Sequence, residues 1–392
     1  MVARLETDGQ LHDPMVRAAL LAVRREVLLP RAYVRRNTPG AQPGVWQLLD
    51  GTHPEDHAEW LKMLYDGGSV LVQHDGEDLA AQRRGTVTGG AITGLSSTVA
   101  MTAHTLQRLE LRPGLRYLEL GTGAGITAAL AAHLLGPGAV VTVEADPHLA
   151  TAARRRLAEH GLPVRVVAGD GLDGCADGGP YNRILSTFAV PSIPPAWLEQ
   201  LAEGGRLLTT ITTASPGWPG ECLVRRTGND FEAVLEGREC GHRPVAGHRW
   251  LSVQDHRHLA NQEPARRRTT DVPPPETDAH GFWLAFSYLA PGVVRDFTAD
   301  HLTLIAPGDA SWTRAVPDGP GTWRIEEGGR REIWAEVEEA HRRWVRAGRP
   351  DTYRLEFSGG RQRAEAGHGT DTIGWDLPTG SVLSAPRDGG RA

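Results

Sequence analysis

The residues best placed to do chemistry are the glycines of a short loop, Gly121, Gly123 and Gly125, which alternate with Thr122 and Ala124. Glycine lets a backbone turn tightly and lets a ligand approach the main chain, because it carries no Cβ atom. The loop falls between an expected strand and an expected helix, so the first amide groups of that helix face whatever binds there. This arrangement indicates a cofactor site, although dinucleotide-binding folds also contain glycine loops.

Two acidic residues follow the loop at spacings that suit a nucleoside. Glu144 ends the next expected strand, about 20 residues further on, where a carboxylate can hold both hydroxyls of a ribose. Asp170 lies between Gly169 and Gly171 after the third strand, where it can accept a hydrogen bond from an adenine amino group. A dinucleotide fingerprint would need glycine in place of Ile126. The pattern therefore favours S-adenosyl-L-methionine, which has no pyrophosphate.

The expected cofactor-binding residues lie in the glycine loop and in the segments that follow the neighbouring strands. They are Glu119, Gly121, Thr122, Gly123, Gly125, Glu144, Ala145, Gly169, Asp170 and Gly171. The alternative is a tight strand-to-helix turn that binds no ligand. Such a turn would require neither Glu144 nor Asp170, so we prefer the cofactor site.

The glycine loop belongs to a stretch, residues 115–211, in which apolar strand-like runs alternate with amphipathic helices. We expect strands at residues 116–120, 140–144, 164–167, 181–187 and 206–211, and helices at residues 126–135 and 148–160. Strands that alternate with helices of about 10–15 residues are typical of βαβ units and a parallel sheet. The predicted fold class is α/β, with a doubly wound Rossmann-like sheet.

The segments on either side of this stretch are less regular. Upstream we expect helices at residues 14–29 and 99–109, a strand at residues 69–73, and an irregular Gly-, Ser- and Thr-rich loop at residues 85–97. Downstream we expect a Pro-rich linker at residues 264–280, strands at residues 283–288, 301–305 and 353–357, and a helix at residues 331–347. The predicted domains are residues 1–235, with an inserted stretch at 37–78, and a smaller α+β domain at residues 236–392 with a disordered tail at 385–392.

The overall composition limits the classes of partner. The formal net charge of the 392 residues is -6, which argues against a nucleic-acid binder. No run of about 18 apolar residues is present, so no membrane span is expected. The first residues lack the apolar core of a secretory signal. We therefore expect a cytoplasmic enzyme whose partner is neither nucleic acid nor membrane.

The cysteines and histidines do not predict a metal site. Cys175, Cys222 and Cys240 match no zinc or redox spacing. His53, His57 and His74 lie among acidic residues, and the first two are spaced for one helix face, but the sequence places no third ligand. We interpret this as a solvated helix face and expect no metal.

Four segments carry a recognisable pattern: residues 118–125 (LELGTGAG), 141–146 (VTVEAD), 169–171 (GDG) and 180–205 (PYNRILSTFAVPSIPPAWLEQLAEGG). Together they resemble the protein-L-isoaspartate O-methyltransferase family. Asp173, Tyr181 and the pair Pro194 and Pro195 are also in register, and the similarity covers roughly residues 12–215. The resemblance implies a class I methyltransferase fold, S-adenosyl-L-methionine as cofactor, and methyl transfer to a carboxylate of a peptide or protein.

One departure from the family concerns its Gly-Gln-Thr-x-Ser-type loop, whose serine lies near the reacting carboxylate. The aligned position in this chain is Gly94, and the neighbouring hydroxyls are Thr93, Ser96 and Ser97. A carboxylate is already ionised at neutral pH, so its methylation requires alignment and no general base. We therefore expect Thr93, Ser96 and Ser97 to be the catalytic residues. Alternatively, these hydroxyls satisfy backbone groups in a Ser/Thr-rich turn.

The altered loop and the long C-terminal region lead to the preferred hypothesis for the substrate. Some similar members of the family carry a C-terminal extension and methylate an aspartate of a ribosomally made, lanthipeptide-like peptide. The methyl ester then cyclises to a succinimide, which can open to isoaspartate. The partner would be a peptide, including cyclised precursor peptides. The alternatives are a repair methyltransferase that acts on isoaspartate in damaged proteins, and a non-catalytic binding module that kept the fold.

Overall fold

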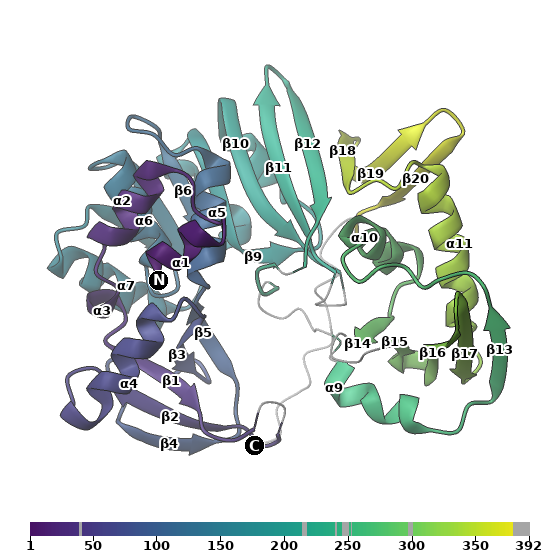
Figure 1. The fold of residues 1–392 in the computed structure, drawn as a ribbon. Coiled ribbons are helices and arrows are strands. Elements are labelled where there is room, and N and C mark those ends of the chain that lie inside the picture. The colour runs from purple at the N-terminus through teal and green to yellow at the C-terminus, as the bar shows by residue number, and fades with distance from the viewer. Residues whose placement is uncertain are drawn as a thin grey trace, which may run out of the picture. The chain divides into compact units, whose positions relative to one another are not determined.

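The computed structural model describes residues 1–38, 41–213, 218–239, 241–244, 251, 253–296 and 301–378 (Figure 1). Cys240 and the predicted tail at residues 385–392 lie outside them. The chain forms two compact units. Unit 1 is Met1–Thr187, Pro194–Leu208 and Arg225–Gly228, and unit 2 is the described part of Phe188–Ile193, Thr209–Val224 and Asn229–Ala392. The predicted domain boundary after residue 235 stays a prediction.

Unit 1 contains the parallel sheet that the sequence predicts. Its strands are β6 (Tyr117–Leu120), β7 (Val140–Glu144), β8 (Val164–Ala168), most of β9 (Tyr181–Val190) and most of β10 (Leu201–Ile211). They follow the order β10-β9-β6-β7-β8, in which β6 is parallel to both β7 and β9, and β7 is parallel to β8. The chain passes from β6 outward to β8 and then returns to β9 on the other side of β6. This order confirms the predicted α/β class.

Three helices of unit 1 match the helices predicted at residues 99–109, 126–135 and 148–160, and the others were not predicted as such. The helices of this unit are α1 (Val2–Thr7), α2 (Pro14–Ala22), α3 (Arg25–Leu28), α4 (Pro54–Tyr65), α5 (Val99–Leu109), α6 (Ile126–Leu135), α7 (Pro147–Glu159) and α8 (Pro195–Glu199), with short 3-10 turns η1 (Gly171–Asp173) and η2 (Ala176–Gly178). The prediction of one helix at residues 14–29 is wrong. Val23 is extended, with ψ at 113°, so the chain forms two helices, α2 and α3, in this range.

A second sheet precedes the parallel one in unit 1. Its strands are β1 (Arg31–Arg35), β2 (Val45–Asp50), β3 (Val70–His74), β4 (Gly85–Thr88) and β5 (Ile92–Ser96), in the order β4-β2-β1-β3-β5. The prediction of an irregular loop at residues 85–97 is therefore wrong. All four residues of β4 are exposed, so this segment shows no buried alternation, and its pairing with β2 is a tertiary contact.

The edge strands β4 and β5 of this second sheet are close in sequence. Only residues 89–91 separate them, and Gly89 and Gly90 have φ of +83° and +66°. Five flat strands would place the edges about 19 Å apart, whereas four residue steps span at most about 14 Å. The sheet must therefore curl strongly. After β5 the chain continues almost directly into helix α5, whose N-terminus is capped by Thr98.

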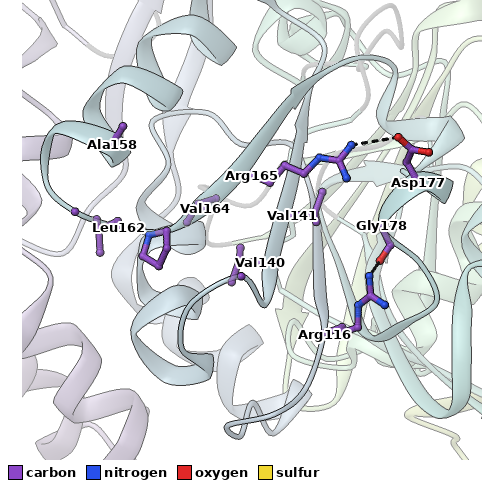
Figure 2. A pocket seen from close by; sticks show the side chains of 12 residues that line it. Arg116, Val140, Val141, Ala158, Leu162, Val164, Arg165, Asp177 and Gly178 are labelled. Atoms are coloured by element: carbon purple, nitrogen blue, oxygen red, sulfur yellow. Dashed lines mark hydrogen bonds and ion pairs between the residues drawn. The ribbon is translucent and has the colours of Figure 1, made fainter.

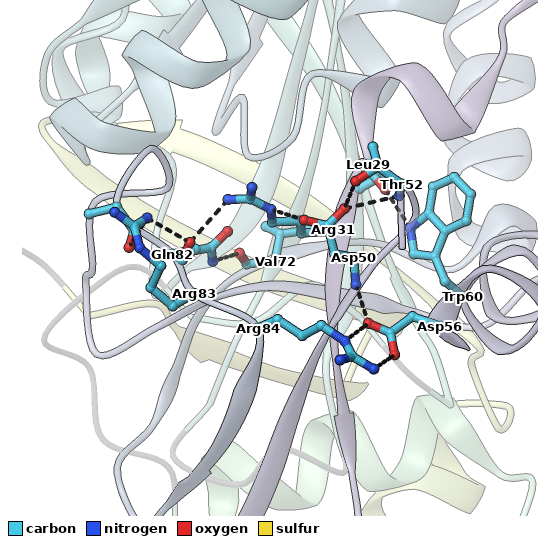
Figure 3. A network of polar contacts seen from close by, with 11 residues as sticks. Leu29, Arg31, Asp50, Thr52, Asp56, Trp60, Val72, Gln82, Arg83 and Arg84 are labelled. Atoms are coloured by element: carbon cyan, nitrogen blue, oxygen red, sulfur yellow. Dashed lines mark hydrogen bonds and ion pairs between the residues drawn. The ribbon is translucent and has the colours of Figure 1, made fainter. Parts of the chain in front are cut away.

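A polar network fixes β2 and α4 in the second sheet (Figure 3). Arg84 binds the buried carboxylate of Asp56 with two hydrogen bonds, of 2.7 and 2.9 Å. The amide of Asp50 donates to Asp56 Oδ2 at 3.0 Å, and Arg31 binds Asp50 at 2.7 Å. The Arg84 guanidinium holds the pKa of Asp56 low, at about 2. The Asp56 carboxylate therefore stays ionised near neutral pH.

Unit 2 contains two sheets and two long helices. The first sheet has the strand order β20 (Asp371–Asp376), β19 (Arg361–His368), β18 (Thr352–Ser358), β12 (Asp230–Gly237) and most of β11 (Gly220–Thr227). The second sheet has the order β13 (Arg266–Thr270), β17 (Thr322–Gly328), β16 (Ser311–Gly319), β15 (Leu302–Ala306) and β14 (Val294–Asp296). The helices are α9 (Val253–His256), α10 (His280–Leu289) and α11 (Ile333–Arg346), with short turns η3 (Arg257–Asn261) and η4 (Pro307–Asp309).

Two predictions for unit 2 are wrong. Residues 283–288 form part of helix α10, because Phe282, Trp283 and Phe286 are buried on several sides of it and a short apolar run carries no strand alternation. The predicted linker contains the edge strand β13, whose exposed arginines pair with the backbone of β17. The strands predicted at residues 301–305 and 353–357 and the helix at residues 331–347 are present as β15, β18 and α11.

None of the described helices is long and apolar enough to cross a lipid bilayer.

Candidate functional site

The glycine loop lies at the point where the order of the parallel sheet reverses. It leaves the carboxyl end of β6, between β7 and β9, which is where ligands bind in open α/β sheets. Gly121, Gly123 and Gly125 have φ of +95°, +53° and +85°, a region that side chains rarely adopt. A Cβ atom on Gly123 would lie 3.0 Å from the carbonyl oxygen of Leu95. The loop geometry therefore requires glycine and brings the end of β5 against it.

Glu144 ends β7 and holds the glycine loop directly. Its Oε2 accepts a hydrogen bond from the amide of Gly123 at 2.8 Å, and its Oε1 accepts one from the amide of Asp146 at 3.1 Å. Burial raises the pKa of Glu144, although these backbone hydrogen bonds act in the opposite direction. The structure thus places the Glu144 carboxylate beside Gly123, and its role in binding a ribose stays a prediction.

Glu119 is fully buried one residue before the end of β6. Its Oε2 accepts a hydrogen bond from Thr142 at 2.7 Å, and the Thr142 hydroxyl lies 2.7 Å from that of Thr122. Its Oε1 has no hydrogen-bond partner among the described residues. Burial, together with the nearby charge of Glu144, raises the pKa of Glu119 to about 8. A buried carboxyl oxygen without a protein partner is suited to meet a polar group of a ligand.

Asp170 follows the end of β8 by two residues and shapes the turn there. Its exposed side chain accepts a hydrogen bond from the amide of Leu172 at 2.8 Å and caps η1. The indole of Trp197 donates to the carbonyl oxygen of Gly171 at 2.8 Å. Gly169 donates its amide to the carbonyl oxygen of Glu144 at 2.9 Å. The predicted acids therefore lie at, or two residues beyond, the ends of neighbouring strands at one sheet edge.

The three predicted catalytic hydroxyls occupy different environments. We call residues 92–97 the hydroxyl segment. Thr93 donates to Gln73 Oε1 at 2.8 Å and accepts from the amide of Gly76 at 2.9 Å, so its hydroxyl is engaged within the protein. Ser96 is buried, whereas Ser97 is partly exposed. Leu95, which precedes Ser96, lies with its carbonyl oxygen against Gly123 of the glycine loop. The catalytic role of these hydroxyls stays a prediction.

Gly94, which aligns with the serine of the family loop, has no room for a side chain. It lies opposite Gln73 in the pairing of β3 with β5. A Cβ atom at Gly94 would lie 2.9 Å from the Cβ of Gln73 and 3.1 Å from a methyl group of Leu149. The first turn of α7 and strand β3 therefore occupy the space that a serine hydroxyl would need.

The sequence reasoning missed Gln73 and Thr142. Gln73 is fully buried, and its Nε2 donates to Asp146 Oδ2 at 3.1 Å. Thr142 is buried in the middle of β7 and is the hydrogen-bond partner of Glu119. Both are polar residues within predicted strands. A polar side chain in an otherwise apolar strand was the one sequence feature that could have indicated a buried hydrogen bond at these positions. Their partners are set by tertiary contacts.

A pocket of about 640 Å³ lies elsewhere in unit 1 (Figure 2). Val140 and Val164, which line it, are the first residues of β7 and β8. Arg165 and Asp177 form an ion pair of 3.4 Å at its rim. This pocket is therefore at the amino ends of the strands, whereas the glycine loop is at their carboxyl ends, and it is not the cofactor site.

Among the described residues no group of three or more His, Cys, Asp or Glu side chains is arranged to hold a metal ion. His57 Nδ1 lies 2.7 Å from the carbonyl oxygen of Gly51, and His74 Nε2 lies 2.9 Å from that of Gly89. His53 is the residue before helix α4. His57 and His74 thus contact different backbone carbonyl oxygens, and His53 precedes a helix.

Comparison with known proteins identifies similar sequences. The profile of the family described as "Protein-L-isoaspartate(D-aspartate) O-methyltransferase (PCMT)" matches residues 88–217. The protein-L-isoaspartate O-methyltransferase of Methanothermobacter thermautotrophicus is 42% identical over 133 residues, which are 33% of this chain and 60% of that protein. The enzyme of the same name from Hyperthermus butylicus is 38% identical over 221 residues, which are 54% of this chain and 73% of that protein. The chain spans 50 to 60% of the length of the first such relatives.

A solved structure with the name protein-L-isoaspartate O-methyltransferase is 19% identical, with a TM-score of 0.48 over 95% of this chain and 98% of that one. The order of the parallel sheet and the glycine loop at its reversal define a class I methyltransferase fold. The identity with the Hyperthermus butylicus enzyme, over nearly three quarters of its length, shows that the chain belongs to the protein-L-isoaspartate O-methyltransferase family. The resemblance in the sequence is confirmed at this level, and the relation to peptide-tailoring variants with a C-terminal extension stays a prediction.

Proposed function

We propose that this chain is an S-adenosyl-L-methionine-dependent carboxyl O-methyltransferase that acts on isoaspartate in peptides or proteins. Membership in the family supports the reaction class, and the contact between Glu144 and the Gly123 amide carries the assignment to this chain. This acceptor is the alternative of the sequence analysis, and the comparisons support it better than the lanthipeptide-like substrate. The cytoplasm is the compartment in which we expect the enzyme to act.

The residues of the glycine loop fit the proposed cofactor. The backbone of Gly121, Gly123 and Gly125 can lie close to a ligand, because no Cβ atom intervenes. Glu144, at the end of β7, would bind the ribose hydroxyls, and Asp170, two residues after β8, would accept from the adenine amino group. The unpartnered Oε1 of Glu119, which carries the proton because Oε2 accepts from Thr142, offers a donor for a further polar group. When bound, S-adenosyl-L-methionine supplies an electrophilic methyl group.

The acceptor carboxylate would need orientation more than activation. A carboxyl group with a pKa near 4 is ionised at neutral pH and already carries a nucleophilic oxygen. Ser96 and Ser97 lie next to Leu95, whose carbonyl oxygen contacts the glycine loop, so they are the hydroxyls best placed to donate to that carboxylate. The Thr93 hydroxyl already donates to Gln73 and accepts from Gly76, so it would not bind the acceptor carboxylate directly and would act only by positioning these neighbours. The donors would hold the carboxylate in line without competing for the methyl group.

A second candidate is methylation of a normal aspartate in a ribosomally made peptide. Gly94 favours it, since the hydroxyl of the family loop is missing there and Leu149 and Gln73 leave no space for one. A site that has lost this donor would hold the isoaspartate carboxylate differently. The remaining hydroxyls, on Ser96 and Ser97, would then set the acceptor.

Mass spectrometry with matched peptides distinguishes the two candidates. The purified chain is mixed with S-adenosyl-L-methionine and two peptides of one sequence, one with isoaspartate and one with aspartate in a constrained ring. A gain of one methyl group on the isoaspartate peptide alone supports the proposed function. A methylated aspartate peptide that then drops to one water below its starting mass supports the second candidate. Methylation of neither peptide would contradict both.

The variants Ser96→Ala and Ser97→Ala, tested with the same peptides, assign the donor. The variant that lowers kcat without weakening the binding of S-adenosyl-L-homocysteine identifies the hydroxyl that orients the acceptor. If neither variant lowers kcat, the hydroxyl segment does not take part in orienting the carboxylate.

A further inference from the structure

Gln73 connects the hydroxyl segment to Asp146, which follows the cofactor acid Glu144. It is fully buried in β3 and uses both ends of its side-chain amide. Its Oε1 accepts a hydrogen bond from Thr93 in the hydroxyl segment, at 2.8 Å. Its Nε2 donates to Asp146 Oδ2 and to the carbonyl oxygen of Glu77, both at 3.1 Å. The orientation of the amide is therefore fixed, because a hydroxyl lies at one end and a carboxylate at the other.

Asp146 carries this connection on to the cofactor acid. Its Oδ1 caps helix α7 by accepting from the amides of His148 and Leu149, at 2.8 and 3.0 Å. Its own amide donates to Glu144 Oε1 at 3.1 Å, and Glu144 Oε2 accepts from Gly123. A continuous chain of hydrogen bonds thus runs from the hydroxyl segment to the glycine loop.

We propose that Gln73 is a positioning residue that couples the place of the hydroxyl segment to the place of the cofactor acid Glu144, through Asp146. This inference rests on the proposed function only for the identity of the ligands. Binding of either ligand would order the segment that holds the other, because the chain Thr93–Gln73–Asp146–Glu144 has donors and acceptors in one fixed sense. Loss of the Nε2 donor should loosen Glu144 while leaving the Thr93 hydrogen bond in place.

Two substitutions test the coupling. Gln73→Glu keeps the shape and the acceptor for Thr93, but it places a carboxylate against the carboxylate of Asp146. Gln82→Glu is the matched control. Gln82 is also buried, and its Nε2 donates to the carbonyl oxygen of Val72 and to Glu77 Oε1, so the variant makes a similar pair of carboxylates without contacting Asp146.

The first measurement is amide hydrogen exchange in the free protein over residues 144–149. We expect exchange there to rise at least about tenfold in Gln73→Glu relative to Gln82→Glu, since a hydrogen bond to a charged group is lost. The second is the Kd for S-adenosyl-L-homocysteine, measured by calorimetry, which should rise at least about tenfold in Gln73→Glu alone. Both variants should lower Tm by similar amounts, so a loss of stability cannot by itself produce the difference.

A rescue variant completes the test. Asp146→Asn in the Gln73→Glu background restores a donor and an acceptor with their roles exchanged, and it retains the oxygen that caps α7. Recovery of slow exchange supports the coupling. Equal exchange in Gln73→Glu and Gln82→Glu, or a double variant as loose as Gln73→Glu, would overturn it. A wild-type chain that binds no S-adenosyl-L-homocysteine would contradict the proposed function, while the exchange result would still decide the role of Gln73.

Discussion

The glycine loop after β6 and the hydroxyl segment after β4 form two sides of one candidate site, but their shapes have different origins. In the glycine loop, three residues with positive φ lie within five positions and the shape follows from the local sequence. In the hydroxyl segment, the backbone is held by pairing with β3, by packing against Leu149, and by the hydrogen bond from Thr93 to Gln73. The shape of the cofactor loop is therefore encoded locally, whereas the position of the hydroxyl segment depends on a separate sheet.

The largest expected effect tests the local side of the comparison. Gly123→Ala adds a Cβ atom 3.0 Å from the carbonyl oxygen of Leu95, at a φ of +53°. The loop must shift, so we expect the Kd for S-adenosyl-L-homocysteine, measured by calorimetry, to rise about 100-fold, or about 2.7 kcal/mol. Gly136→Ala is the control, because Gly136 also has positive φ but has open space around its Cβ position. It should lose stability without losing affinity, and an equal loss of affinity would show that backbone strain alone explains the result.

The second effect tests the buried interior beneath the glycine loop. The pKa of Glu119 is raised to about 8 by burial, so the folded protein keeps this group protonated at pH values where the unfolded chain has ionised it. The folded state then binds more protons, and stability falls as pH rises from about 4.5 toward 8. We expect the free energy of unfolding of wild type to fall relative to that of Glu119→Gln, by on the order of 2 kcal/mol between about pH 5 and about pH 6.5.

Urea denaturation of the two proteins at both pH values measures this difference. Glu159→Gln, at the end of α7, is the control for a carboxyl group on the protein surface and should follow wild type. A difference between wild type and Glu119→Gln that does not depend on pH would mean that Glu119 is already ionised in the folded protein.

The smallest effect tests whether the second sheet can be weakened without changing the cofactor side. Asp56→Asn removes a buried carboxylate that binds Arg84 and the amide of Asp50, so we expect the free energy of unfolding at pH 7 to fall by about 1–2 kcal/mol. Since the pKa of Asp56 is lowered to about 2, its stabilisation is present above the unfolded value of 3.8 and is lost as pH falls through 2. The deficit should therefore shrink at pH 3.

Denaturation and calorimetry on the same samples decide this third prediction. The Kd for S-adenosyl-L-homocysteine should stay within about twofold of wild type, because the network of Asp56 does not contact Asp146 or Glu144. Glu55→Gln, which changes an exposed partner of Arg84, should alter neither quantity by much. A similar loss of affinity in Asp56→Asn would contradict this prediction. It would mean that the second sheet as a whole, and not Gln73 in particular, is coupled to the glycine loop.

Much of the cofactor side could be predicted from the sequence. The ranges of α5, α6 and β7 match their predictions, because each follows a clear period of 3.6 or a continuous apolar run. Of the predicted acids, Glu144 ends β7 and Asp170 follows the end of the neighbouring strand β8 by two residues. For two other elements the local sequence pattern did not predict the observed structure. Strand β4 is exposed at every position, and helix α10 is apolar on nearly every side, so neither carries the alternation or the amphipathic stripe from which such elements are predicted.

The sequence by itself determined the class of the parallel sheet, the place of the glycine loop and the family. These follow from periodicity and from residues close together in the chain, since backbone conformation and strand-to-helix alternation are local properties. The tertiary structure alone decided how the hydroxyl segment meets that loop. Gln73 and Leu149 contact β5 from distant positions in the chain, and Asp146 is linked to it through Gln73. Contacts of this kind depend on how strands pair and pack. The space at Gly94 is closed only because Gln73 and Leu149 fill the surrounding volume.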